Sequence, residues 1–139
     1  MDARDLALLN ARGRMAIGAS LVLAPRLIGP MWIGDAGDPV VKMMSRALGA
    51  RDLALGLGLA VALDRGKPVR GWLEGAALAD GGDLMATLLA GDSIPRGKRR
   101  RVALVAAVSL VGCAVVARML DPPPAPVQVP EARATGHGQ

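Results

Sequence analysis

The chain has 139 residues, of which 52% are hydrophobic, and it carries a formal net charge of +5 at neutral pH. This length fits one domain, and the apolar content lies between that of a soluble core and that of a membrane bundle. Phenylalanine and tyrosine are absent, whereas soluble cores usually hold some bulky aromatic side chains. Small apolar residues suit helices that approach closely in lipid, so the composition favours a membrane protein.

Several classes of site are excluded by the same counts. Cys113 is the only cysteine and His137 the only histidine, which excludes an internal disulfide, a His-based catalytic triad and a His/Cys metal cluster. Five of the 17 basic residues lie within one short run, without the aromatic residues that single-stranded nucleic acids require for stacking. We therefore expect no nucleic acid, no metal, no cofactor and no catalytic residue, and we interpret Cys113 as a packing residue.

The first predicted helix covers residues 5–24. It begins with a polar part that includes Asn10, Arg12 and Arg14, and it continues with an uncharged run up to Ala24. A basic region before a short apolar stretch is typical of a signal peptide. A cut after Ala24 would place Pro25 directly behind it, so we expect a helix of the mature protein instead.

Residues 25–39 are predicted to form a loop, because proline and glycine recur throughout them. This loop carries Trp32, and Trp72 lies at the start of the third predicted helix. Indole side chains prefer the boundary between membrane and water. We therefore predict that Trp32 and Trp72 anchor the protein at opposite interfaces.

The second and third predicted helices, residues 40–63 and 69–90, are separated only by a short polar turn. They should form an antiparallel hairpin, in which Arg51 faces the level of Asp83 and Asp52 faces the level of Asp80. Glycines on both helices, such as Gly49, Gly56 and Gly58 on the second, would let helices touch.

Charges in the middle of this hairpin need partners, because an unpaired Arg or Asp at the centre of a membrane span costs roughly 2.5–3.5 kcal/mol. We predict an internal network of ion pairs, and we expect Glu74 to lie apart from it, facing headgroups or Arg70. The predicted members of the network are Arg46, Arg51, Asp52, Asp80 and Asp83.

Three interpretations of these charges remain open. They fix the register of the helices, in which case the protein is a packing or interaction module. Alternatively they bind a small molecule, an ion or a proton, with Asp80 and Asp83 as acceptors beside Arg51. In the third interpretation the protein is soluble and the charges form a salt-bridged core.

The fourth predicted helix covers residues 102–120 and carries no charge before Arg118. A proline run follows it directly, and residues 121–139 are expected to form a disordered tail rich in Pro and Gly. A basic cluster precedes the helix and is predicted to contact anionic lipid headgroups. This cluster comprises Arg96, Lys98, Arg99, Arg100 and Arg101.

The stretch from Arg46 to Gly56, which reads RALGARDLALG, and the later Asp80-Gly-Gly-Asp83 step resemble a family of small four-helix bacterial membrane proteins of unknown function. This family is frequent in actinobacteria and distantly related to DoxX-like proteins. The resemblance covers roughly residues 10–120. It implies a multi-pass protein of the bacterial inner membrane, and it brings no activity and no cofactor.

Together these observations predict an all-α protein: an antiparallel four-helix transmembrane bundle over residues 1–120, followed by the tail. The expected function is that of an accessory or interaction subunit whose ion pairs fix the second and third helices. The alternative is a membrane protein that handles a small molecule, an ion or a proton through Asp80, Asp83 and Arg51. Expected partners are anionic lipids and either a larger membrane complex or further copies of the chain.

Overall fold

A computed structural model describes residues 2–32 and 37–120, and these residues form helices joined by short turns. The prediction of an all-α fold is confirmed for this part of the chain. The predicted tail, residues 121–139, lies outside the described residues. The elements are α1 (Ala3–Leu23), α2 (Pro25–Trp32), α3 (Pro39–Asp64), α4 (Arg70–Leu89), the 3-10 helix η1 (Gly91–Ser93) and α5 (Arg96–Leu120).

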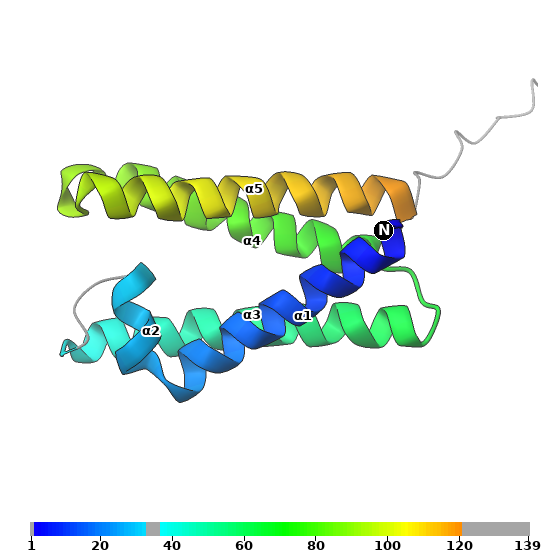
Figure 1. Cartoon of the computed structure of the whole chain (residues 1–139), viewed down its shortest axis with the longest axis horizontal. Coiled ribbons are helices and arrows are strands. Elements are labelled where there is room, and N and C mark those ends of the chain that lie inside the picture. The colour runs from blue at the N-terminus through cyan, green and yellow to red at the C-terminus, as the bar shows by residue number, and fades with distance from the viewer. Residues whose placement is uncertain (1, 33–36, 121–139) are drawn as a thin grey trace, which may run out of the picture.

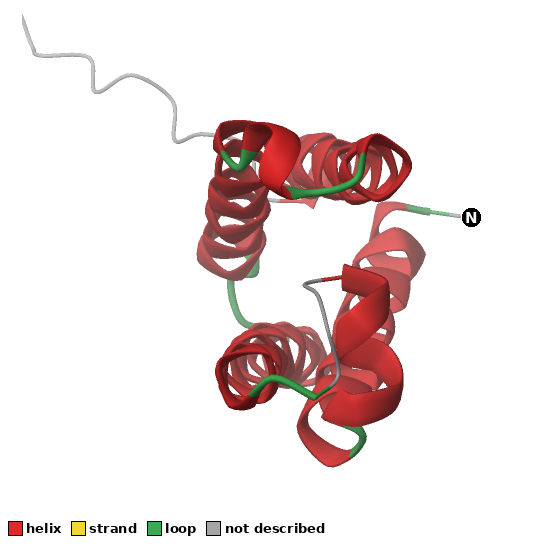
Figure 2. Ribbon diagram, turned by 90° about the vertical axis from the view of Figure 1, so that its left-hand side faces the viewer, coloured by secondary structure: helices red, strands yellow, loops and turns green. Residues whose placement is uncertain are grey.

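The four long helices run alternately up and down and form two pairs, α1 with α3 and α4 with α5 (Figure 1). Figure 2, which looks along the bundle, shows the four helices at its corners. The start of α1, the turn between α3 and α4 and the end of α5 share one end of the bundle, which we call the terminal end. The opposite end, with α2, η1 and the start of α5, is called the distal end.

The pairing of helices differs from the prediction. Sequence reasoning placed α3 mainly against α4, because a tight turn joins them, whereas α3 packs mainly on α1. Glycines make this close approach possible: a Cβ atom added to Gly18 would lie 2.6 Å from the Gly49 carbonyl oxygen, and one on Gly56 would lie 2.7 Å from the Ala11 carbonyl oxygen. Backbone therefore contacts backbone along α1 and α3.

The terminal end is filled by an apolar core. Buried leucine and alanine side chains from the two helix pairs meet there, close to the turn between α3 and α4. This core joins the two helix pairs by apolar contacts at the terminal end. Its largest fully buried members are Leu59 and Leu73, and they are joined by Ala7, Ala11, Ala62, Leu63, Val69, Val116 and Ala117.

Residues 25–39 were predicted to be a loop, but their first eight residues form α2. Pro25 occupies the first helical position, where a missing N–H group costs nothing. Pro30 lies in the last turn, so it removes a single helical hydrogen bond. Asp38 then caps α3 by accepting a 2.7 Å hydrogen bond from the backbone N–H of Val40. The side chain of Trp32 is outside the described part of the structure.

The fifth helix begins six residues before the predicted boundary, because the basic cluster itself is helical. Arginine and lysine are good helix formers, whereas the prediction followed only the apolar run. The carbonyl group of Pro95 accepts hydrogen bonds from the backbone N–H groups of Lys98 and Arg99 at 2.9 and 3.0 Å. The cluster thus forms the first turns of α5 and not a connecting loop.

A first prediction concerns the contact between α1 and α3. Gly18→Ala should lower the free energy of unfolding by about 1–3 kcal/mol, because the added methyl group would collide with backbone atoms of α3. Gly13→Ala on the same helix is the matched control, since no atom lies within 4 Å of its added Cβ. It should be neutral or stabilise by up to about 1 kcal/mol. Denaturant titration followed by circular dichroism measures both; equal effects would contradict the packing.

Candidate functional site

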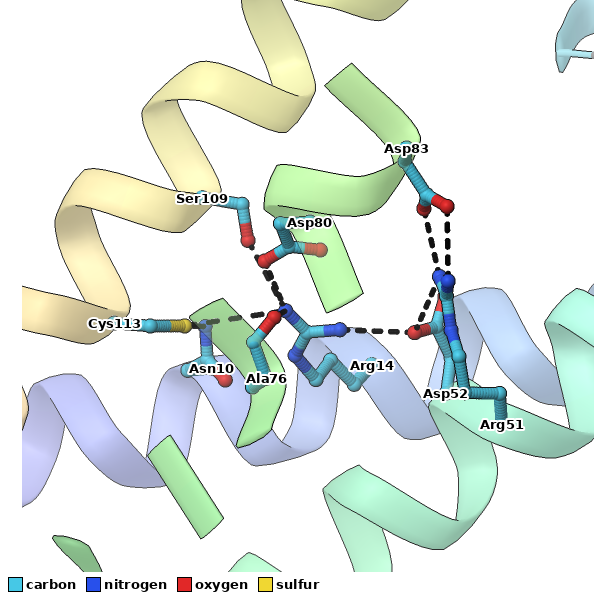
Figure 3. A network of polar contacts seen from close by, with 9 residues as sticks. All are labelled: Asn10, Arg14, Arg51, Asp52, Ala76, Asp80, Asp83, Ser109 and Cys113. Atoms are coloured by element: carbon cyan, nitrogen blue, oxygen red, sulfur yellow. Dashed lines mark hydrogen bonds and ion pairs between the residues drawn. The ribbon is translucent and has the colours of Figure 1, made fainter. Parts of the chain in front are cut away.

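Arg14 of α1 lies at the centre of a polar network in the middle of the bundle and is only 7% exposed (Figure 3). Its Nη1 atom donates a 2.8 Å hydrogen bond to Oδ1 of Asp52 on α3. Its Nη2 atom donates to Asp80 on α4, and it lies 3.4 Å from both the Ala76 carbonyl oxygen and the Ser109 hydroxyl oxygen on α5. One guanidinium group therefore contacts side chains from the three other long helices.

Arg51 forms the second centre of the network. Its guanidinium donates two parallel hydrogen bonds to Asp83, with distances of 2.9 Å from Nη1 to Oδ1 and 2.7 Å from Nη2 to Oδ2. The same Nη2 atom lies 3.4 Å from Oδ1 of Asp52, which also accepts from Arg14. Asp52 thus joins the two arginines. The structure brings Arg51 and Asp83 to one level, as the register of the hairpin predicted.

A sulfur atom closes the network on the side of α5. The Asn10 amide nitrogen donates to the Cys113 sulfur at 3.3 Å, and Arg14 Nη2 lies 3.9 Å from the same sulfur. Cys113 is buried, so it packs in the interior as expected and is also a weak acceptor. Three buried atoms in the region, Asn10 Oδ1, Arg14 Nε and Arg51 Nε, have no hydrogen-bond partner in the described structure.

Arg46 was predicted to belong to this network, and the structure places it elsewhere. Five residues separate it from Arg51, which corresponds to a rotation of about 140° around the helix axis. Its side chain is exposed near the distal end, where it borders a pocket with Arg26 and Lys42. The network therefore contains two arginines, Arg14 and Arg51, and not Arg46.

Arg14 was the residue that sequence reasoning missed, because it was grouped with Arg12 in the polar start of the first helix. A signal was present in the spacing. Ala7, Ala11, Gly18 and Leu21 recur at three- and four-residue steps on the buried face of α1, and Arg14 completes that series. Arg12 lies off this face and is exposed.

Glu74 stays apart from the network, as predicted, and pairs with Arg70, with a 2.6 Å distance between Arg70 Nε and Glu74 Oε1. Trp72, a predicted interface anchor, lies near the terminal end with its side chain about two-fifths exposed. Its ring covers Gly58 so closely that a Cβ atom there would lie 2.2 Å from Trp72 Cζ3. The missing side chain at Gly58 therefore leaves room for the Trp72 ring, so that α4 contacts α3 at that end.

The predicted lipid-contact cluster lies at the distal end and is mostly exposed. Two of its members also make contacts within the protein. Lys98 Nζ donates a 2.5 Å hydrogen bond to the Pro30 carbonyl oxygen of α2, and Arg99 Nη1 lies 3.7 Å from Asp92 Oδ1. Arg96, Arg100 and Arg101 are exposed.

A cavity of about 320 Å³ opens beside the network, between the two helix pairs and toward the distal end. All four long helices contribute to it, and its walls are mainly apolar. The charged residues of the network form its polar part, together with Ser109 and Thr87. The apolar walls include Ile17, Leu21, Leu48, Ile94, Val102 and Val105.

In comparisons with protein-family models, curated proteins and solved structures, the chain matches none. The resemblance to small four-helix bacterial membrane proteins thus stays a prediction. Among the described residues, no three His, Cys, Asp or Glu side chains are grouped closely enough to hold a metal ion. The geometry instead shows two arginines and three aspartates joined by hydrogen bonds.

A second prediction follows from the central position of Arg14. Arg14→Gln should lower the free energy of unfolding by about 3–5 kcal/mol, because it leaves Asp52 and Asp80 without their main buried partner. Glu74→Gln breaks an ion pair whose carboxylate is largely exposed and should cost no more than about 0.5 kcal/mol. Chemical denaturation compares the two variants, and a small effect of Arg14→Gln would show that the network does not hold the bundle together.

Proposed function

We propose that the protein is a multi-pass membrane protein of the bacterial inner membrane, in which all four long helices cross the bilayer. Two of them, α1 and α5, are long and apolar enough to do so by themselves. The observation that carries the proposal is an inverted distribution of polarity, with charges inside the middle of the bundle and apolar side chains outside.

The outer surface of the middle part is rich in large apolar side chains, a feature that marks a membrane or protein contact. Each of the four long helices contributes residues that are more than half exposed. Exposed charges, by contrast, gather toward the two ends; Arg12 is an exception whose long side chain can reach toward the headgroups. Examples of the exposed apolar residues are Leu9, Leu57, Leu78, Leu104, Val108 and Val111.

Length and charge pairing extend the proposal to α3 and α4. They contain 26 and 20 residues, which correspond to about 39 and 30 Å, enough for a hydrocarbon core of about 30 Å. Their central charges are Arg51 and Asp52 on α3 and Asp80 and Asp83 on α4. All four take part in ion pairs inside the bundle, so none of them has to face lipid unpaired.

Within the membrane, we propose that the protein acts as an accessory or interaction subunit. Arg14, Asp52, Asp80 and Ser109 connect the four long helices at one level, and such buried polar contacts specify register. A bundle with a fixed register presents a constant apolar surface to a larger complex or to a second copy. The basic cluster on α5 supports contact with anionic headgroups at the distal end.

A second candidate function is the binding of a small molecule, an ion or a proton, and the cavity beside the network favours it. Ionisable groups inside a membrane bundle are candidates for function. Here Asp80, Asp83 and Arg51 line a cavity with apolar walls. Both functions use the same ion pairs, since a site of this kind needs the bundle that the pairs hold in place.

A third prediction distinguishes four membrane spans from two. Lys67 lies in the turn between α3 and α4, and Asp92 lies in η1 before α5. If all four helices span, Lys67→Cys and Asp92→Cys should react with a membrane-impermeant maleimide from opposite sides of the membrane. If only α1 and α5 span, both should react from the same side. Cys113→Ser removes the native thiol from the background.

The behaviour of the purified chain in solution tests the membrane assignment itself. The purified chain should require detergent or lipid to stay monodisperse, because its middle surface is apolar. A chain that remains monodisperse in plain buffer would contradict the proposal and support the soluble interpretation with a salt-bridged core.

A fourth prediction tests the structural role of the pair between α3 and α4. Arg51→Gln and Asp83→Asn should each lower the unfolding temperature, and the double variant should recover part of the loss, with a coupling energy of about 0.5–3 kcal/mol. Thermal unfolding in detergent measures this cycle. Single variants that unfold like the wild type would favour the ligand-binding candidate over a purely structural network.

A further inference from the structure

The network does not balance its own charge. Arg14 and Arg51 contribute two positive charges, and Asp52, Asp80 and Asp83 contribute three negative charges when ionised, so the cluster carries one net negative charge. No other charged side chain lines the adjoining cavity. An uncompensated charge in a low-dielectric interior is costly, and a bound positive charge would remove that cost.

The free acceptors of the network are carboxylate oxygens. Oδ1 of Asp52 accepts from both arginines, and Asp83 accepts with both oxygens, whereas no described residue donates to Oδ2 of Asp52 or Oδ1 of Asp80. Figure 3 shows the second Asp80 oxygen pointing away from Arg14. Asp52 and Asp80 line the cavity and keep 14% and 9% of their side-chain surface exposed.

Two N–H donors of the network also lack a hydrogen-bond partner, but a ligand in the cavity cannot reach them. The Nε atoms of Arg14 and Arg51 are fully enclosed. A molecule in the cavity therefore meets the two free carboxylate oxygens beside a net negative charge, while the guanidinium groups are already engaged with the aspartates. This arrangement is complementary to a group that is both cationic and a hydrogen-bond donor, which is the chemistry of a protonated amine.

The walls of the cavity indicate the rest of the molecule. Leu48 of α3 and Val102, Val105 and Ala106 of α5 line it with apolar surface, and its volume of about 320 Å³ is near the lower limit for small-molecule sites. A proton alone would balance the charge but would leave these walls without an occupant. A metal ion would require a group of ligands that the described residues do not form.

We infer that the cavity binds a small amphipathic monovalent cation, a protonated amine with an alkyl or aryl tail, whose ammonium group meets Asp52 and Asp80. This inference deepens the second candidate function and rests on it. The ammonium N–H groups donate to the two free carboxylate oxygens, and the tail lies against α3 and α5 toward the distal end. The bound cation brings the network to electrical neutrality.

The test uses the purified full chain in an uncharged detergent and three probes of the same shape. Benzylammonium, benzyl alcohol and benzoate differ in charge and share one ring, and isothermal titration calorimetry at neutral pH measures their binding. Benzylammonium should bind saturably, with an affinity at least about 10-fold higher than that of benzyl alcohol, because its ammonium group adds charge-assisted hydrogen bonds to the carboxylates. Benzoate should not bind. Equal binding of the amine and the alcohol, or tighter binding of benzoate, overturns the inference.

Two pairs of variants locate the site. Asp80→Asn should weaken benzylammonium binding about 10-fold or more, whereas Asp92→Asn makes the same chemical change outside the cavity and should leave it unaltered. Val105→Phe adds bulk to the cavity wall without changing any charge and should also weaken binding. Val111→Phe, on the same helix and similarly exposed but away from the cavity, is its control. If Asp80→Asn does not fold, the comparison of Val105→Phe with Val111→Phe still tests whether the ligand lies in the cavity.

The outcomes separate this inference from the membrane proposal. If no probe binds while maleimide labelling shows four spans, the cation site is refuted and the bundle stands. If benzylammonium binds but Val105→Phe and Val111→Phe behave alike, the ligand lies outside this cavity and the inference is likewise refuted. If labelling shows two spans, the bundle proposal fails, whatever the calorimetry gives.

Discussion

One buried guanidinium group connects the four long helices of the bundle. Arg14 is held by carboxylates of α3 and α4 and lies within hydrogen-bonding distance of a hydroxyl on α5, so it is the point at which both helix pairs meet away from the apolar core. An arginine suits this position because its planar donors point in several fixed directions at once, which a lysine ammonium cannot reproduce with the same geometry. Without it, Asp52 would retain Arg51 as a weaker partner, while Asp80 would have no described ion-pair partner.

The packing of the bundle differs on the two sides of this guanidinium group. On one side, leucines and alanines close the terminal end and need no polar partner. On the other side, the helix pairs leave a cavity that adjoins the charges. The ionic layer thus lies between the apolar core and the cavity. A charge cluster at such a boundary is enclosed by the bundle and also borders open space, so the proposed structural and binding roles rest on the same residues.

The sequence predicted the helical class and the level of the Arg51–Asp83 pair, because periodicity, tight turns and antiparallel register are local properties. It did not predict which helices pack together. The glycines on α3 were visible, but the close partner of Gly49 and Gly56 is α1, and only the three-dimensional arrangement shows that. Arg46 and Arg14 differ from the prediction for a related reason, because azimuth on the helix, and not nearness in sequence, decides which side chains enter the network. Arg46 lies about 140° from Arg51 around α3, whereas Arg14 continues the buried series of α1.

The distribution of charge along the chain also bears on how a membrane-embedded form would assemble. The first and last long helices, α1 and α5, satisfy the requirements for a span without help, whereas α3 and α4 carry central charges that need partners on other helices. Asp52 finds its partner on a helix made earlier, and Asp80 finds the same one. In the proposed four-span form, Arg14 would therefore couple the insertion of the two inner helices to the presence of the first, and tertiary contacts and membrane entry would be one cooperative event.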